Sequence, residues 1–408
     1  MAELSYHISD GERKKNTLCI PESHTLYLCP RACGRRQGIR AIKNGIKQRV
    51  SFLMFSEEDV ISGAYEQSVI EAVEELIELL DCTPRVILLY VNCIDDFLNT
   101  DEKYLINCLD DAFPKIQFLL SHINPIAADL AKEPASAIHA RLYELLCITK
   151  KHDRFINLVG NFEQIPSESE WEDFLAYAGW EGIRHLDLCK TYAEYLAMAD
   201  SELTISLSHI GDMAAMDMTT RLGIPHLIWH ASYDLNTVAD RYRELFSLSK
   251  ISDEILRPYI NQTRQEIHDT QRCLEGRLIA VDSSASRRPF SLACTLLDYG
   301  FKVFVVFALH QKDPDKEARE KLSKKYPEVV VITHEAHEAI TGYDINTECI
   351  SIGKDAAFLL QQQNFIDMHN DEGYFGFYGI SKLMKKLRAA RNSSNFQRSP
   401  KSDSKKEI

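Results

Sequence analysis

Short apolar segments alternate with amphipathic helices along the chain, and this pattern restricts the fold more than any other feature. Residues 86–91 (VILLYV) are apolar throughout, which is typical of a strand buried on both faces. Before them, residues 65–80 carry apolar side chains at helical spacing: Val69, Ile70, Val73, Leu76, Ile77 and Leu80. Such strands, separated by helices, predict a parallel sheet covered by helices on both faces.

The same alternation recurs, so we predict an α/β fold with three Rossmann-like parallel-sheet lobes. The expected divisions are residues 1–151, residues 152–274 with a helical connector, residues 275–391, and a disordered Ser/Lys-rich tail at 392–408. The expected strands are residues 25–28, 50–55, 86–91, 155–159, 185–188, 203–207, 277–281, 302–307, 329–333 and 349–352.

Four of the 11 cysteines form a candidate ligand set, with three thiols within fifteen residues and a fourth just past an expected strand. Cys19, Cys29 and Cys33 fall close together, and Cys93 follows the apolar run at 86–91. We expect a loop from Cys29 to Cys33, followed by a basic helix through residues 38–47. Iron–sulfur clusters are held by thiolates, often with one ligand far away in sequence. The pattern therefore suggests a redox protein with a buried cluster.

A structural use of these thiols is the alternative, because free cysteine is commonly a small buried hydrophobe. The Cys29–Cys33 pair lacks the third cysteine of a radical-SAM motif and the second close pair of a zinc site. Spacing alone leaves both interpretations open. The other cysteines sit singly in apolar stretches and are expected in the core: Cys82, Cys108, Cys147, Cys189, Cys273, Cys294 and Cys349.

Composition and missing motifs exclude several classes of protein. With 60 acidic and 47 basic side chains, the net charge of −13 argues against nucleic-acid binding. No apolar run approaches the ~20 residues that span a bilayer, and an odd cysteine count without a secretion signal indicates a cytoplasmic protein. The turn at 282–288 (DSSASRR) has no glycine, so we expect no ATP or dinucleotide binding by this chain. Any nucleotide-driven step would come from a partner.

Five stretches, in this order, resemble the nitrogenase component 1 family. They are residues 28–34 (LCPRACG), 55–64 (FSEEDVISGA), 91–96 (VNCIDD), 222–225 (LGIP) and 373–379 (GYFGFYG). The resemblance extends from about Cys19 to Ala390. The family includes molybdenum–iron protein subunits, their cofactor-assembly scaffolds, the dark-operative protochlorophyllide reductase and the nickel-sirohydrochlorin reductive cyclase. It implies three lobes of the nitrogenase component 1 type.

The resemblance also implies a cofactor and partners. Cys19, Cys33 and Cys93 would ligate an iron–sulfur cluster, 4Fe-4S or larger, shared at a subunit interface. Cys29 is an extra thiol, either the ligand in place of Cys33 or a bystander. An identical or paralogous component 1 subunit would supply the remaining ligands. An ATP-dependent iron–sulfur reductase would supply electrons.

Two departures separate the chain from the molybdenum–iron catalytic subunit, which holds its large cofactor through a cysteine and a histidine. Residues 207–213 (LSHIGDM) contain no cysteine, and Phe375 stands where the histidine is expected. A phenyl ring cannot ligate metal, so reduction of dinitrogen by that cofactor is not expected.

Polar residues after the strand at 203–207 are candidates for catalysis. His209 and Asp212 are predicted to face a cleft between lobes and to supply a proton or bind a ligand. A purely structural histidine is the alternative.

We therefore predict the catalytic subunit of a nitrogenase-like reductase that acts on a small molecule or a tetrapyrrole-like substrate. Two alternatives stay open: a non-catalytic scaffold for metallocluster assembly, and a subunit of a 2-hydroxyacyl-CoA dehydratase-like enzyme. The latter would need a CoA-thioester substrate.

Overall fold

The computed structural model describes residues 17–56, 61, 65–92, 101–123, 134–308, 315–333, 349–362 and 365–392. Contacts divide the chain into two compact units. We call Glu12–Pro166 with Trp171–His230 the N-terminal unit. The C-terminal unit comprises Met1–Gly11, Ser167–Glu170 and Ala231–Ile408.

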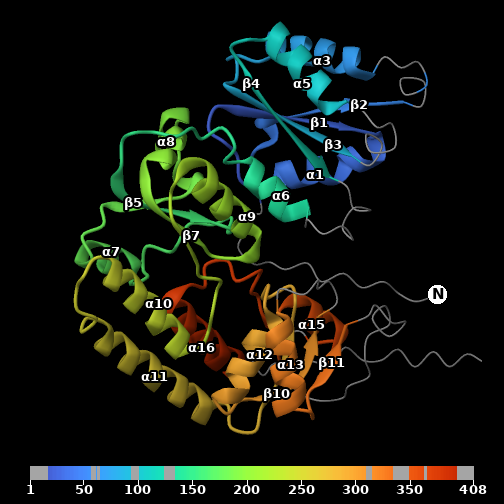
Figure 1. The fold of residues 1–408 in the computed structure, drawn as a ribbon. Helices are drawn as coiled ribbons and strands as arrows, with labels where there is room; N and C mark the ends of the chain where they lie inside the picture. The colour runs from blue at the N-terminus through green and yellow to red at the C-terminus, as the bar shows by residue number, and fades with distance from the viewer. Residues whose placement is uncertain are drawn as a thin grey trace, which may run out of the picture. The chain divides into compact units, whose positions relative to one another are not determined.

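The first sheet of the N-terminal unit has four parallel strands in the order β2-β1-β3-β4. They are β1 (Ser23–Cys29), β2 (Val50–Met54), β3 (Val86–Asn92) and β4 (Gln117–Ile123). Helices α3 (Tyr65–Leu79) and α5 (Glu102–Ala112) cover one face, and α1 (Arg31–Lys43) and α6 (Pro134–Arg141) lie on the other (Figure 1). Leu26 and Leu28 of β1 pack with Val69 and Leu105 in the core beneath α3 and α5.

The second sheet of this unit has the order β6-β5-β7-β8, also parallel. Its strands are β5 (Asp153–Val159), β6 (Gly182–Arg184), β7 (Ser201–Ser206) and β8 (His226–Ile228). Its helices are α7 (Trp171–Tyr177), α8 (Tyr192–Leu196) and α9 (His209–Asp217). Single turns of 3₁₀-helix occupy Lys47–Arg49, Leu186–Leu188 and Ala197–Asp200. One apolar cluster contains Val86 and Leu119 of the first sheet, Val159 of the second, and Met218, which follows α9. The two sheets therefore share one core.

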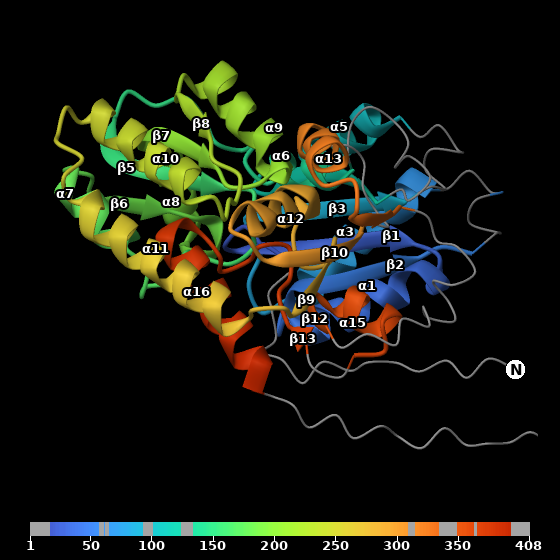
Figure 2. The ribbon, with the colours of Figure 1, turned by 90° about the horizontal axis from the view of Figure 1, so that it is seen from below.

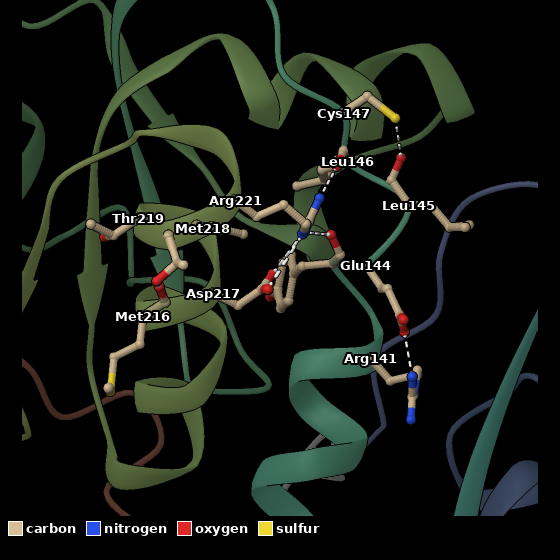
Figure 3. A network of polar contacts seen from close by, with 12 residues as sticks. Arg141, Glu144, Leu145, Leu146, Cys147, Met216, Asp217, Met218, Thr219 and Arg221 are labelled. Carbon is tan, nitrogen blue, oxygen red and sulfur yellow. Dashed lines mark hydrogen bonds and ion pairs between the residues drawn. The ribbon is translucent and has the colours of Figure 1, made fainter.

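Arg221 ties the connection between these sheets to the end of α9. It lies in a π-helical turn, Met218–Leu222, that continues α9. Its guanidinium donates to the carbonyls of Leu146 and Tyr143 and to the Asp217 carboxylate, at 2.9 Å for Tyr143 and 2.7 Å for Asp217 (Figure 3). Because residues 143–146 lie between α6 and β5, this one side chain fixes the path of the chain from the first sheet to the second.

The C-terminal unit contains a five-stranded parallel sheet in the order β11-β10-β9-β12-β13. Its strands are β9 (Leu278–Asp282), β10 (Lys302–Phe307), β11 (Val330–Ile332), β12 (Cys349–Ile352) and β13 (Phe365–Ile366). Its helices are α10 (Leu235–Leu248), α11 (Leu256–Cys273), α12 (Pro289–Asp298), α13 (Lys316–Lys325), α15 (Lys354–Leu359) and α16 (Gly376–Asn392). The long helices α11 and α16 pack side by side (Figures 1 and 2).

The α/β class with three parallel sheets is confirmed. Each predicted lobe contains one sheet, and the predicted lobe boundaries stay a prediction. The predicted tail from residue 393 onward lies outside the described residues. Within the described segments, no helix combines the length and apolarity needed to cross a bilayer.

Three local predictions were wrong. Of the cysteines expected in the core, Cys294 and Cys349 are buried, but Cys82 and Cys147 are exposed because they lie in connecting segments outside the helices and strands. Residues 185–188 form no strand, because Leu186–Leu188 is a 3₁₀ turn whose Asp187 N–H donates to the ring of His185 at 3.2 Å. The expected loop from Cys29 to Cys33 is also absent, since β1 runs to Cys29 and α1 begins at Arg31. Only Pro30 separates the two elements.

Candidate functional site

The C-terminal ends of β1 and β3 form a topological switch point of the first sheet. Strand β1 lies between β2 and β3, and α1, which follows β1, covers the opposite face of the sheet from α5, which follows β3 (Figure 1). In α/β sheets ligands bind at such a point. Asn92, the last residue of β3, donates from Nδ2 to the carbonyl of Leu28 in β1 at 2.9 Å. This bond joins the two strand ends. Cys93 follows Asn92 directly in the chain and itself lies outside the described residues.

Cys29 ends β1 and is buried beneath α1, with 5% of its surface exposed. A β-carbon placed on Gly34 would lie 3.2 Å from the Cys29 Sγ and 3.2 Å from the ring of Phe52. The glycine therefore lets α1 lie close over this thiol. Burial, with a smaller contribution from nearby Cys33, raises the pKa of Cys29 to about 11. The Cys29 side chain is thus a neutral thiol at neutral pH.

Cys33 lies in the first turn of α1 and is exposed. It is close enough to Cys29 for the two thiols to interact electrostatically. The structure thus brings Cys29 and Cys33 together at the switch point. In the part of the chain that the structure describes, no three His, Cys, Asp or Glu side chains converge as a metal site. Cys93 is outside that part.

Cys19 precedes β1 in the chain. Its neighbour Ile20 accepts a hydrogen bond from the hydroxyl of Ser23, the first residue of β1, at 2.6 Å. Cys29 is the last of the seven residues of this strand. Cys19 and Cys29 both add to the effect of burial in raising the pKa of Tyr27, and Cys19 does the same for Tyr90. The Cys19 thiol therefore lies near this tyrosine pair, in the half of β1 and β3 that leads to the strand ends.

The second sheet has a switch point between β5 and β7, and His209 and Asp212 lie there in the first turn of α9. The Asp212 carboxylate contacts the His230 Nε2 at 2.8 and 3.1 Å, and it accepts a hydrogen bond from Ser206 Oγ at 2.7 Å. Burial alone would raise the pKa of Asp212, but the bonds from His230 and Ser206 outweigh it and lower this pKa below its usual value. Asp212 is thus held as a carboxylate.

A close approach of two backbone segments places Asp212. A β-carbon on Gly211 would lie 2.7 Å from the Cα of Gly160, which directly follows β5. Ser208, just before α9, also donates from Oγ to the carbonyl of Gly160. The first turn of α9 is therefore fixed against the end of β5.

His230 was missed by the sequence reasoning. It lies two residues beyond the end of β8, which neighbours β7, so its position after a short apolar segment was the available signal. The three-residue length of β8 made that strand hard to recognise.

The C-terminal motif at 373–379 surrounds a buried carboxylate in the C-terminal unit. Glu170 accepts hydrogen bonds from the backbone N–H groups of Phe377 (2.6 Å) and Tyr378 (3.0 Å) and from the Tyr242 hydroxyl (2.6 Å). Burial raises the pKa of Glu170. Gly376 adopts a φ of +66°, and a β-carbon there would lie 2.1 Å from the carboxylate. The chain's own carboxylate thus occupies the N-terminal end of α16.

Comparison with known proteins agrees with this architecture. The family model for nitrogenase component 1 type oxidoreductases matches residues 16–390. A solved chain described as "Nitrogenase Cp1 at pH 6.5" is similar with a TM-score of 0.69 and 13% identity, covering 91% of this chain and 89% of that chain. Another, "Nitrogenase Cp1 at pH 5", has a TM-score of 0.65 and 16% identity, with 92% and 86% covered. No curated protein matches the sequence.

The match of the family model covers nearly the whole chain, and the parallel sheets with their switch points are those expected of such a fold. This chain belongs to the nitrogenase component 1 type oxidoreductase family.

Proposed function

We propose that the chain is the cluster-bearing subunit of a nitrogenase-like, two-component reductase. Membership of the family supports an oxidoreductase-type subunit. The observation that carries the proposal is the position of exposed Cys33 at the switch point, with Cys93 directly following the residue that bonds to Leu28. The substrate would be a small molecule or a tetrapyrrole-like compound rather than dinitrogen.

The donor set at this edge fits an iron–sulfur cluster. Thiolates are the soft ligands that such clusters require, and Cys33 and Cys93 follow neighbouring strands. A bound cluster would supply one-electron transfer at low potential. Because Cys33 is exposed and Cys29 is buried beneath α1, we assign Cys33 as the ligand and Cys29 as the bystander. Cys19 is kept as the third candidate ligand, because its thiol lies near Tyr27, on which Cys29 also acts.

The exposure of Cys33 supports a shared site. A cluster held by an exposed thiol can also bind ligands from a second chain. We propose that an identical or paralogous component 1 subunit supplies them. An ATP-dependent iron–sulfur reductase is proposed as the electron donor. Ligands contributed by two chains would make cluster loading and assembly interdependent.

Protons for the reduction are proposed to come from the second switch point. Ser206 orients Asp212, and Asp212 holds the Nε2 side of the His230 ring at 2.8 Å. A carboxylate that fixes an imidazole is the usual arrangement for a general acid or base. His209 is in the same turn and interacts electrostatically with Asp212. We assign His230, with His209 as the second candidate, to hold and release the proton, and Asp212 to position it.

The exclusion of dinitrogen reduction rests on the C-terminal motif. Glu170 fills the space at the start of α16, and Phe375 offers no metal ligand. A large metal cofactor would have no protein ligand from this segment.

Serine variants of the four cysteines test the proposal after anaerobic purification. Cys33→Ser and Cys93→Ser are expected to lose most of the bound iron and acid-labile sulfide, because serine replaces a thiolate ligand. Cys29→Ser is expected to retain both, and iron content of Cys19→Ser decides whether Cys19 is a ligand.

Cys82→Ser is the matched control. Cys82 is exposed and precedes the N-terminal end of β3, whereas the candidate ligands are assigned to the C-terminal strand ends. Iron and sulfide at wild-type levels in both Cys33→Ser and Cys93→Ser would overturn the proposed site.

A further inference from the structure

The third sheet also has a switch point, between β9 and β12, and a buried carboxylate fills it. Asp282 ends β9 and is fully buried. Its Oδ1 accepts hydrogen bonds from the Ser284 N–H (2.8 Å), the Ser284 hydroxyl (2.7 Å) and the Ala285 N–H (2.9 Å). Its Oδ2 accepts from the Ala356 N–H at 2.6 Å. Three backbone amides and a hydroxyl thus converge on one anion.

The segment that follows β12 is shaped around the same carboxylate. Gly353 directly follows β12 and adopts a φ of +105°. A β-carbon at this position would lie 2.1 Å from Oδ1 of Asp282 and 2.3 Å from Oδ2. The segments that follow β9 and β12 therefore both contact the Asp282 side chain.

An ordinary Asx turn explains only part of this arrangement. Such a turn accounts for the bonds from Ser284 and Ala285, which follow Asp282 in sequence. It does not account for the bond from Ala356 or for the close fit against Gly353, because both residues belong to the segment that follows β12. Burial raises the pKa of Asp282, so only the surrounding donors offset the cost of its charge.

In doubly wound sheets, backbone N–H groups at this position bind the phosphate of a nucleotide. We propose that the Asp282 carboxylate occupies the position of such a phosphate and so prevents nucleotides from binding at the third sheet. This explains why residues 282–288 contain no glycine: the turn surrounds a carboxylate of its own chain instead of a phosphate. Removing this carboxylate should leave an empty hole that accepts a small oxyanion.

Chemical rescue of Asp282→Ala tests the proposal directly. We expect thermal unfolding of this variant at a clearly lower Tm than the wild type, because buried donors lose their acceptor. Sodium formate should restore most of the lost Tm in a saturable manner, since formate supplies the missing carboxylate. Inorganic phosphate is the second probe, and chloride at equal ionic strength separates binding from a general salt effect.

Asp282→Asn is the matched control. Its amide still fills the hole, but when its oxygen accepts from Ser284 and Ala285 its NH2 group faces the Ala356 N–H, so this variant should be destabilised and formate should not restore it. Asp298→Ala is a second control, since Asp298 bonds to Lys321 and Lys325 at the surface. Formate should leave its Tm unchanged beyond the chloride effect.

Two results would overturn the proposal. One is a saturable rise in the Tm of the wild type with ADP or phosphate that is retained in Asp282→Asn, which would show an open nucleotide site. The other is folded Asp282→Ala that formate fails to stabilise beyond chloride. Where Asp282→Ala fails to fold, Asp282→Ser takes its place with the same expectations. Iron content does not enter these measurements, so their outcome is independent of the proposed reductase function.

Discussion

Gly376→Ala is expected to destabilise the C-terminal unit by about 4 kcal/mol or more. A left-handed backbone conformation costs a residue with a β-carbon about 1–2 kcal/mol, and Gly376 has a φ of +66°. The new methyl group would also lie 2.1 Å from Glu170 and 2.3 Å from the Tyr242 hydroxyl. It must displace a buried carboxylate that accepts three hydrogen bonds, and bonds to charged groups contribute about 1.5–3 kcal/mol each.

Gly276→Ala is the control, because Gly276 has a φ of +81° and open space around its Cα. It should cost only the conformational term, about 1–2 kcal/mol. Urea unfolding followed by circular dichroism gives both values, and hydrogen exchange in α16 locates the effect. Equal losses of stability in the two variants would contradict the role assigned to Glu170.

Gly211→Ala is expected to destabilise the N-terminal unit by about 3 kcal/mol, the upper part of the usual range for overpacking. The β-carbon would lie 2.7 Å from both the Cα and the N of Gly160 and 2.8 Å from Ser206 Oγ. Two of these atoms belong to the backbone, so they cannot rotate away. The first turn of α9 must then move from the end of β5, and Ser206 must shift from Asp212.

Tryptophan fluorescence reports the unfolding of the N-terminal unit specifically, because Trp171, Trp180 and Trp229 all belong to it. Met216→Ala serves as the control, since Met216 is exposed on the same helix. An unfolding midpoint for Gly211→Ala that equals that of Met216→Ala would show that the close approach to Gly160 is not required.

Hydrophobic patterning was sufficient to predict most of the fold. Strands β10 and β12 have the predicted bounds, because each is a short apolar run with clear ends. The start of α1 was missed because Pro30, Gly34 and Gly38 together suggest a loop. In the structure Gly34 and Gly38 lie on one face of the helix, where a β-carbon would contact Phe52 at 3.2 and 3.7 Å. Such glycines reflect packing across the sheet, which local sequence does not reveal.

The candidate sites were predicted less completely than the fold. Asp212 was predicted as a candidate because polar residues that follow parallel strands gather at the strand ends where ligands bind, and its role stays a prediction. Its partner His230 is 18 residues away and follows a strand of only three residues, so their contact depends on the order of strands in the sheet. The position of Cys19 shows the same limit. Cys19 precedes β1, and its proximity to Tyr27 and Tyr90 depends on how the segment before the strand packs against the sheet.

The three switch points differ in what they hold. The first carries thiols, the second an Asp–His pair, and the third a carboxylate that fills its own site. A reductase that receives electrons at the first and protons at the second would need no nucleotide at the third. This division agrees with a separate ATP-dependent electron donor.

The most direct test of this account is iron and acid-labile sulfide quantitation of the anaerobically prepared wild-type protein, with EPR after dithionite reduction. The account predicts stoichiometric iron and sulfide and an EPR signal from a reduced iron–sulfur cluster. Folded protein that retains no iron, and takes up none on reconstitution with iron and sulfide, would contradict the account and leave Cys33 and Cys93 with a structural role.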